Sequence, residues 1–146
     1  MKRLQMNVAF PEGYKLLRAL DDAVKRSGIA PLYLELIKVR ASQLNGCAYC
    51  LNKHISEAIS FGEDPRRFYV LSAWREAPEW FSEEEKAILL ITEEITNIGG
   101  HGVSDEVYNK AIALFGEDLT AKIIMAAIAI NSLNRIAVGL SLHPTK

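Results

Sequence analysis

The sequence predicts an all-α protein, and three observations carry that prediction. Proline or a capping residue stands where each helix would begin, and glycine stands where many of them would end. Between these marks, apolar residues recur at the three- and four-residue intervals of an amphipathic helix. No segment alternates apolar and polar residues for long enough to predict a strand. We therefore expect one helical domain over residues 1–146.

Three helices are expected in the first half of the chain. Pro11 suits the first turn of a helix over about 11–27, and Pro31 suits the first turn of a helix over about 31–44. A third helix is expected over about 47–61. Glycine follows each of these segments, as it does where a left-handed residue ends a helix.

The second half of the chain carries the same marks. A short helix is expected over about 64–74, where an Asp-Pro pair supplies a cap and a first-turn proline. Ser82 and Glu85 form a capping box, and the helix that it opens is expected to stop at a glycine pair. A further capped segment covers about 104–116, and a last helix covers about 119–142. That last helix is apolar on nearly every face, so we expect it to be buried against neighbours or a partner subunit.

Composition and charge exclude several classes of protein. The chain has 17 basic and 18 acidic residues and a formal net charge of −1, so we expect neither a nucleic acid nor a membrane as partner. The most apolar stretch, about 123–130, is too short to span a bilayer. The first residues lack the apolar core of a signal peptide, so we expect a cytoplasmic protein. In that compartment two cysteines do not predict a permanent disulfide framework.

The spacing of Cys47, Cys50 and His54 is the strongest functional signal. They lie at positions i, i+3 and i+7 of one expected helix, so their side chains share a face. Cys47 stands in the first turn, where free amides and the helix dipole favour a thiolate. His54 follows Cys50 by one turn, close enough to take its proton directly or through a water. A second thiol at this spacing can resolve a sulfenic acid as a disulfide.

Three interpretations of this group remain open at the level of the residues. A redox-active pair is typical of Cys-x-x-Cys at a helix start with a histidine on the same face. A zinc site would find three ligands at most in this run, with the fourth unassigned. Two small buried hydrophobic residues beside a surface histidine would be inert, as free cysteines commonly are. We favour the redox pair and expect neither a cofactor nor a resident metal.

Residues 35–54 resemble the core of the AhpD-like alkylhydroperoxidases, which belong to the carboxymuconolactone decarboxylase superfamily. Four residues fall at the offsets of that core motif: Glu35, Cys47, Cys50 and His54. Residues 82–87 and 131–136 are similar to later helices of the family, so the resemblance extends over about 31–140. It implies a helical bundle that assembles into a homo-oligomer, either a trimer or a hexamer.

The resemblance also implies a peroxidase or disulfide-oxidoreductase cycle. In that cycle Cys50 is the thiolate that attacks a hydroperoxide, and Cys47 is the resolving thiol. His54 and Glu35 form the proton relay that activates Cys50. An external thiol or dithiol reductant, such as a thioredoxin-like protein or a lipoyl donor, would then restore the dithiol.

Two positions leave alternatives. Tyr49 stands where the best-known peroxidases of the family carry a second histidine, which removes one proton-handling group. Glu57 lies three residues after His54 and could orient that imidazole in place of Glu35.

Two alternative functions stay open. One is a carboxymuconolactone-decarboxylase-like lyase that acts on a small organic acid, with His54 and Glu35 as acid and base. The other is a non-catalytic redox-sensing oligomer.

Overall fold

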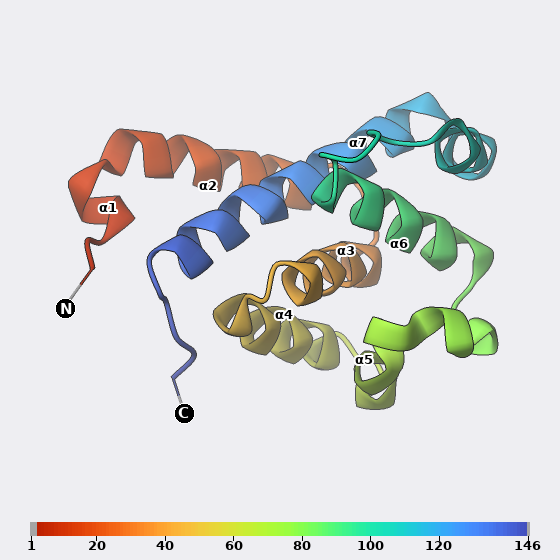
Figure 1. Ribbon diagram of the computed structural model, residues 1–146, viewed down its shortest axis with the longest axis horizontal. Coiled ribbons are helices and arrows are strands. Elements are labelled where there is room, and N and C mark those ends of the chain that lie inside the picture. Colours follow the sequence, from red (N-terminus) through yellow and green to blue (C-terminus); the bar gives the residue numbers. More distant parts are fainter. Residues whose placement is uncertain (1–2, 146) are drawn as a thin grey trace.

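Helices supply all the regular secondary structure of residues 3–145, the part of the chain that the computed structural model describes (Figure 1). In chain order the elements are α1 (Met6–Ala9), α2 (Pro11–Lys25), α3 (Pro31–Leu44), α4 (Ala48–Ser60), α5 (Pro65–Val70), the 3₁₀ helices η1 (Leu71–Glu76) and η2 (Pro78–Trp80), α6 (Glu83–Thr96) and α7 (Asp105–Gly139). No strand occurs within these described residues, and the expected all-α class is confirmed.

The expected helix starts are found where the capping residues predicted them. Proline occupies the first turn of α2, α3 and α5. Ser82 accepts a hydrogen bond from the amide of Glu85, and the Glu85 carboxylate accepts one from the amide of Ser82. Both bonds of the predicted capping box are therefore present at the start of α6.

Three helix boundaries differ from the expectation. The short α1 was not expected, and the segment expected as one helix over 64–74 divides into α5 and η1, with Ala73 outside helical geometry. The last helix ends at Gly139 because Ser141 takes a positive φ of 54° and turns the chain away. The expected break at Gly116 is present: its φ of 71° and ψ of 176° divide α7 into two helical parts.

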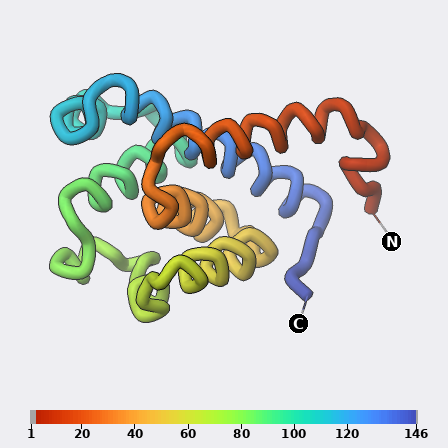
Figure 2. Tube along the Cα trace, turned by 180° about the vertical axis from the view of Figure 1, so that it is seen from behind, coloured from red at the N-terminus to blue at the C-terminus, as the bar shows by residue number. Residues whose placement is uncertain are grey.

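Helix α3 lies at the centre of the bundle and packs against α4, α6 and α7 (Figures 1 and 2). Helix α2 packs along α7, at the end of the molecule where the chain begins and ends. Every residue of α3 over 34–42 is buried. Three of them are charged: Glu35, Lys38 and Arg40. Burial of ionic groups at this depth requires partners, and the partners of Glu35 and Lys38 belong to the site described below.

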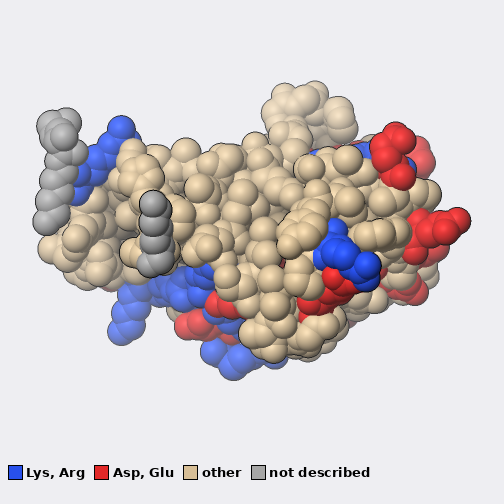
Figure 3. All heavy atoms as spheres, turned by 90° about the horizontal axis from the view of Figure 1, so that it is seen from below, with Lys and Arg blue, Asp and Glu red and all other residues tan. Residues whose placement is uncertain are grey.

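The outer surface mixes charged and apolar side chains. On the face shown in Figure 3, acidic side chains gather at one end, while neutral side chains cover a broad area between the charged groups. Several large apolar residues are exposed near the N-terminus and along α7, among them Leu4, Val8, Leu16, Met125 and Val138. None of the helices within residues 3–145 combines the length and the hydropathy that a membrane crossing requires.

Candidate active site

The turn between α3 and α4 brings the expected site residues together. Gly46 has a φ of 64°, a left-handed conformation that reverses the chain and lays α4 back along α3. The side-chain amide of Asn45 donates to the Oδ1 atoms of Asn131 (2.9 Å) and Asn134 (3.0 Å) on α7. Asn134 in turn donates to Ser42 Oγ at 3.0 Å. These polar contacts fix the turn, and with it the start of α4, against the last helix.

A disulfide joins Cys47 and Cys50, whose Cα atoms lie 5.3 Å apart. Both residues are buried. Cys47 is the N-cap of α4, and its Sγ accepts a hydrogen bond from the amide of Cys50 at 3.2 Å. The same position would stabilise a negative charge on Cys47 Sγ in the dithiol form, because amides at a helix N-terminus favour an anion. The local backbone thus permits the pair to close and favours a thiolate.

The imidazole of His54 is held by two carboxylates at one nitrogen. Its Nδ1 lies 2.9 Å from Glu35 Oε2 and 2.9 Å from Glu57 Oε2. The sequence left open whether Glu35 or Glu57 contacts His54, and in the structure both do. Because Nδ1 faces the carboxylates, Nε2 is the ring nitrogen left to exchange a proton with a thiol or a substrate.

Glu57 remains ionised beside this imidazole. Partial burial alone would raise the pKa of Glu57, but a hydrogen bond from Lys53 and the proximity of His54 outweigh that effect and lower the pKa below its ordinary value of 4.5. Glu57 is one-third exposed, whereas Glu35 is almost fully buried. The two carboxylates thus link the imidazole to the core on one side and to solvent on the other.

Sequence reasoning missed the extension of this group into the core. Lys38 is only 1% exposed, and its Nζ lies 3.8 Å from Glu35 Oε1 and 3.5 Å from Asp21 Oδ1 on α2. Burial alone would raise the pKa of Asp21, but Lys38 and Lys25 outweigh it and lower that pKa below 3.8. Neither Lys38 Nζ nor Asp21 Oδ1 has a hydrogen-bond partner. The position of Lys38 in the apolar part of α3 was the available signal that a charged partner lies nearby. That this partner is Asp21 on α2 depends on the tertiary fold.

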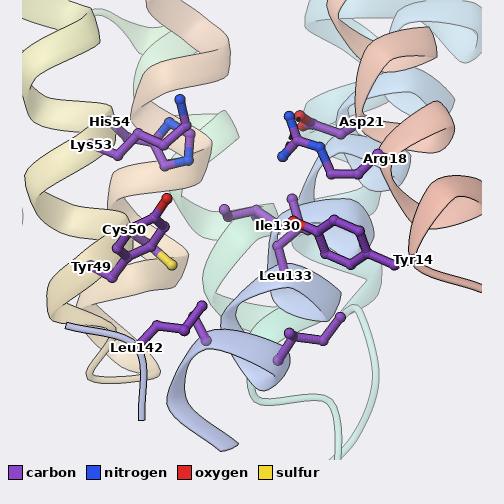
Figure 4. Close-up of a pocket in the computed structure, with 12 residues that line it drawn as sticks. Tyr14, Arg18, Asp21, Tyr49, Cys50, Lys53, His54, Ile130, Leu133 and Leu142 are labelled. Atoms are coloured by element: carbon purple, nitrogen blue, oxygen red, sulfur yellow. Dashed lines mark ion pairs between the residues drawn. The ribbon is translucent and has the colours of Figure 1, made fainter. Parts of the chain in front are cut away.

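A cavity of about 90 Å³ opens between α2, α4 and α7, and Cys50 and His54 both face it (Figure 4). Cys47 is not among the residues that line this cavity. The other lining residues are Tyr14, Arg18, Asp21, Tyr49, Lys53, Ile130, Leu133, Ile136, Ala137 and Leu142. A small molecule in the cavity would therefore contact Cys50 rather than Cys47.

One set of side chains in the described residues has the composition of a metal site. Ligand atoms of Glu35, His54 and Glu57 lie within 4.8 Å of one another. This set differs from the Cys47, Cys50 and His54 group that the sequence left open for zinc. Lys38 already places a positive charge 3.8 Å from Glu35, which opposes a second cation there.

Comparisons with known proteins agree on one family. The model of the carboxymuconolactone decarboxylase family matches residues 11–94. The protein YdfG of Bacillus subtilis is 39% identical over 130 residues, covering 89% of this chain and 88% of that protein.

Two solved structures share the fold. A crystal structure from Agrobacterium tumefaciens, of a protein described as a candidate antioxidant defence protein AhpD, is 36% identical with a TM-score of 0.94 and covers 100% of both chains. A crystal structure of a peroxidase-related protein from a Silicibacter species is 21% identical with a TM-score of 0.79. The match covers 90% of this chain and 69% of the Silicibacter chain, and at 21% identity the likeness concerns the fold alone.

Proposed function

The chain belongs to the carboxymuconolactone decarboxylase family, and from this premise we propose that it is an AhpD-like thiol peroxidase that reduces organic hydroperoxides. One observation carries the proposal: Cys50, which forms a disulfide with Cys47, lines a cavity together with a histidine that is held by carboxylates. A lowered thiol pKa and an adjacent base are what make cysteine a nucleophile at neutral pH.

Access to the cavity favours Cys50 over Cys47 as the attacking thiol. Cys50 lines the cavity together with His54, and Cys47 lies behind it at the N-cap of α4. His54 accepts the proton of the Cys50 thiol at Nε2, while Glu35 and Glu57 stabilise the imidazolium through Nδ1. Cys47 is then placed to attack the sulfur of Cys50 rather than the substrate.

The proposed cycle has three steps. The Cys50 thiolate attacks the terminal oxygen of a hydroperoxide, the O–O bond breaks, and the leaving alkoxide takes a proton from His54 to give an alcohol and a sulfenic acid on Cys50. The Cys47 thiolate attacks that sulfur, which forms the disulfide and releases water after protonation of the hydroxide. An external dithiol reduces the disulfide by exchange and leaves as its own disulfide.

The reductant must reach a buried disulfide. Cys47 and Cys50 are 2% and 4% exposed, so a donor has to present its thiols on a slender group. A lipoyl group or a small dithiol meets that condition through the cavity more readily than a broad protein surface does. We therefore propose a dithiol of this kind as the electron donor.

The second candidate function is a decarboxylase-like lyase, because His54 and Glu35 also form an acid–base pair beside a small cavity. Such a reaction needs no thiol. Replacement of Cys50 therefore separates the two candidates: the lyase would retain its activity and the peroxidase would lose it.

Peroxide consumption with dithiothreitol as reductant tests the proposal. We expect catalytic consumption of tert-butyl hydroperoxide by the wild type and none by Cys50→Ser. Cys47→Ser is the matched control, since it retains the attacking thiol and should consume one equivalent of hydroperoxide when it is mixed with peroxide before any dithiothreitol is added. If the wild type consumes no more peroxide than Cys50→Ser, the peroxidase proposal is wrong.

A further inference from the structure

Arg18 is a cation of the cavity without a strong partner. Its only ionic contact in the described residues is with Asp21 Oδ2 at 3.9 Å, and it donates no hydrogen bond there. Asp21 has closer cations in Lys25, at 3.2 Å, and Lys38, at 3.5 Å. Asp21 is therefore compensated without Arg18, whose side chain is 37% exposed. A guanidinium placed in this way has donors available for a ligand.

The cavity has two opposed walls and an apolar floor. Helix α2 forms one wall with Tyr14 and Arg18, and α4 forms the other with Cys50 and His54 (Figure 4). The Arg18 guanidinium points across the cavity toward the His54 side, and the hydroxyl of Tyr14 points into the same space (Figure 4). Between the walls, α7 contributes only apolar lining residues: Ile130, Leu133, Ile136 and Ala137.

The ionic groups around this cavity favour an anion at its α2 side. Besides His54, the ionic side chains that line it are Arg18, Lys53 and Asp21. Ion pairs connect these lining residues to Lys25, Lys38, Glu35 and Glu57, so that the connected groups other than His54 are four cations and three carboxylates. Each carboxylate has a nearer cation or imidazole than Arg18. The surplus positive charge therefore resides on the one side chain that donates no hydrogen bond and faces the cavity. Arginine recognises carboxylates with its planar donor edge, and each such charge-assisted bond is stronger than a neutral one.

We propose that the substrate is a short organic hydroperoxide that carries a carboxylate, and that Arg18 with Tyr14 binds this carboxylate. The proposal rests on the peroxidase function proposed above. The carboxylate lies on the α2 wall, the alkyl chain crosses the apolar floor of α7, and the hydroperoxide meets Cys50 on the α4 wall. A cavity of about 90 Å³ restricts the enclosed part to a short chain. The chemistry is that of the cycle above: the terminal oxygen passes to Cys50, and the product is the hydroxy acid.

Binding without turnover is the first test. Hexanoate and hexan-1-ol share a chain length and differ in charge, and their dissociation constants can be measured by NMR titration of the oxidised protein. We expect hexanoate to bind more tightly than hexan-1-ol, and Arg18→Gln to weaken hexanoate binding about tenfold. Arg18→Lys should restore part of the loss. Arg26→Gln, an exposed arginine after the same helix, is the matched control and should bind hexanoate like the wild type.

Equal binding of the acid and the alcohol, or an Arg18→Gln variant that binds hexanoate like the wild type, would overturn the proposal. So would an equal loss in Arg26→Gln, because the effect would then reflect general surface charge.

The second test isolates the oxidation step. Stopped-flow mixing of the reduced protein with an ω-hydroperoxyhexanoate or its methyl ester measures disulfide formation with no reductant present. We expect the wild type to prefer the acid about tenfold and Arg18→Gln to lose that preference. If Arg18→Gln instead affects only the reduction of the disulfide by dihydrolipoate, the carboxylate belongs to the reductant and the proposal is wrong. If neither hydroperoxide oxidises the protein, the proposed function fails, and the hexanoate titration alone decides the Arg18 site.

Discussion

Two clusters of polar and charged side chains lie against α3, and they differ in how fully their hydrogen bonds are satisfied. The first, which we term the closed cluster, lies between α3, η1 and α6 and consists of Arg40, Trp74, Arg75 and Glu93. Glu93 accepts four hydrogen bonds in it, from Arg40 (2.9 Å), Trp74 (2.8 Å) and both terminal nitrogens of Arg75 (3.2 and 2.6 Å). No buried side-chain atom of the closed cluster lacks a partner.

The second, which we term the site cluster, consists of Asp21, Glu35, Lys38 and His54. It also joins separate helices, but Lys38 Nζ and Asp21 Oδ1 remain without hydrogen bonds. Asp21 and His54 face a cavity as well. A network whose hydrogen bonds are all made rigidifies a fold. Charged groups whose donors and acceptors are not all used can still respond to a proton or a ligand. The comparison therefore assigns stability to the closed cluster and chemistry to the site cluster.

Replacement of His54 should have the largest effect. We expect His54→Gln to slow peroxide-driven disulfide formation by about 10²- to 10⁴-fold, the usual contribution of a positioned general base. The glutamine amide can still donate to Glu35, so the free energy of unfolding should change by no more than about 1 kcal/mol. Stopped-flow oxidation and urea denaturation check the two values. A rate within threefold of the wild type would remove His54 from the mechanism.

Replacement of Glu93 should produce the opposite pattern. Glu93→Gln leaves the buried guanidinium of Arg40 without a carboxylate, and we expect the free energy of unfolding to fall by about 3–5 kcal/mol. The oxidation rate of the folded protein should remain within about twofold of the wild type. Glu79→Gln, which alters an exposed acid, serves as control and should change stability by less than about 0.5 kcal/mol. Loss of activity without loss of stability in Glu93→Gln would contradict the assignment.

The contribution of Glu93 to the free energy of unfolding should also depend on pH. Burial alone would raise its pKa, but the hydrogen bonds from Arg75 and Trp74 and the charge of Arg40 lower it below 4.5. Because the folded state lowers this pKa, ionised Glu93 stabilises the fold above pH 4.5, and that contribution is lost as the pH falls toward the folded-state pKa. The stability difference between the wild type and Glu93→Gln should therefore be constant near neutrality and shrink below about pH 4. Denaturation curves across this range that show a constant difference would contradict it.

Lys38→Met should have a smaller effect and sharpen the comparison. In this variant Asp21 still pairs with Lys25, and Glu35 still contacts His54. The substitution also removes a buried ammonium that makes no hydrogen bond. The free energy of unfolding should therefore change by no more than about 1 kcal/mol. The oxidation rate should fall roughly tenfold, because Lys38 holds the Glu35 carboxylate that in turn positions the imidazole of His54. The same two assays check this variant. If stability falls by several kcal/mol and the rate is unchanged, Lys38 belongs with the structural charges.

Most of the helical framework could be predicted from the sequence because its signals are local. Pro11, Pro31 and the Ser82–Glu85 capping box act through their own backbone, and Gly116 interrupts α7 where it was expected to end a helix. The short α1 and the change from α5 to η1 were missed. In both places the helical segment is too short for apolar periodicity to be read.

The candidate site could be predicted only in part. The spacing of Cys47, Cys50 and His54 places them on one helix, and Glu35 required the family resemblance as a guide. Arg18, Asp21 and Lys38 were not found, because their proximity depends on how α2 packs across α3 and α7. Asn131 and Asn134 offered a signal that went unused. They are amides within an otherwise apolar helix, and buried amides require partners.

The most direct measurement is the identification of the sulfur that receives the peroxide oxygen. In the Cys47→Ser variant the sulfenic acid cannot be resolved, so one equivalent of hydroperoxide followed by dimedone should label the attacking cysteine, and peptide mass spectrometry locates the label. We predict one dimedone adduct on Cys50 in this variant, and no adduct on Cys47 after the same treatment of Cys50→Ser. An adduct on Cys47 in Cys50→Ser, or no adduct on Cys50 in Cys47→Ser, would contradict the assignment of Cys50 as the peroxide-attacking thiol.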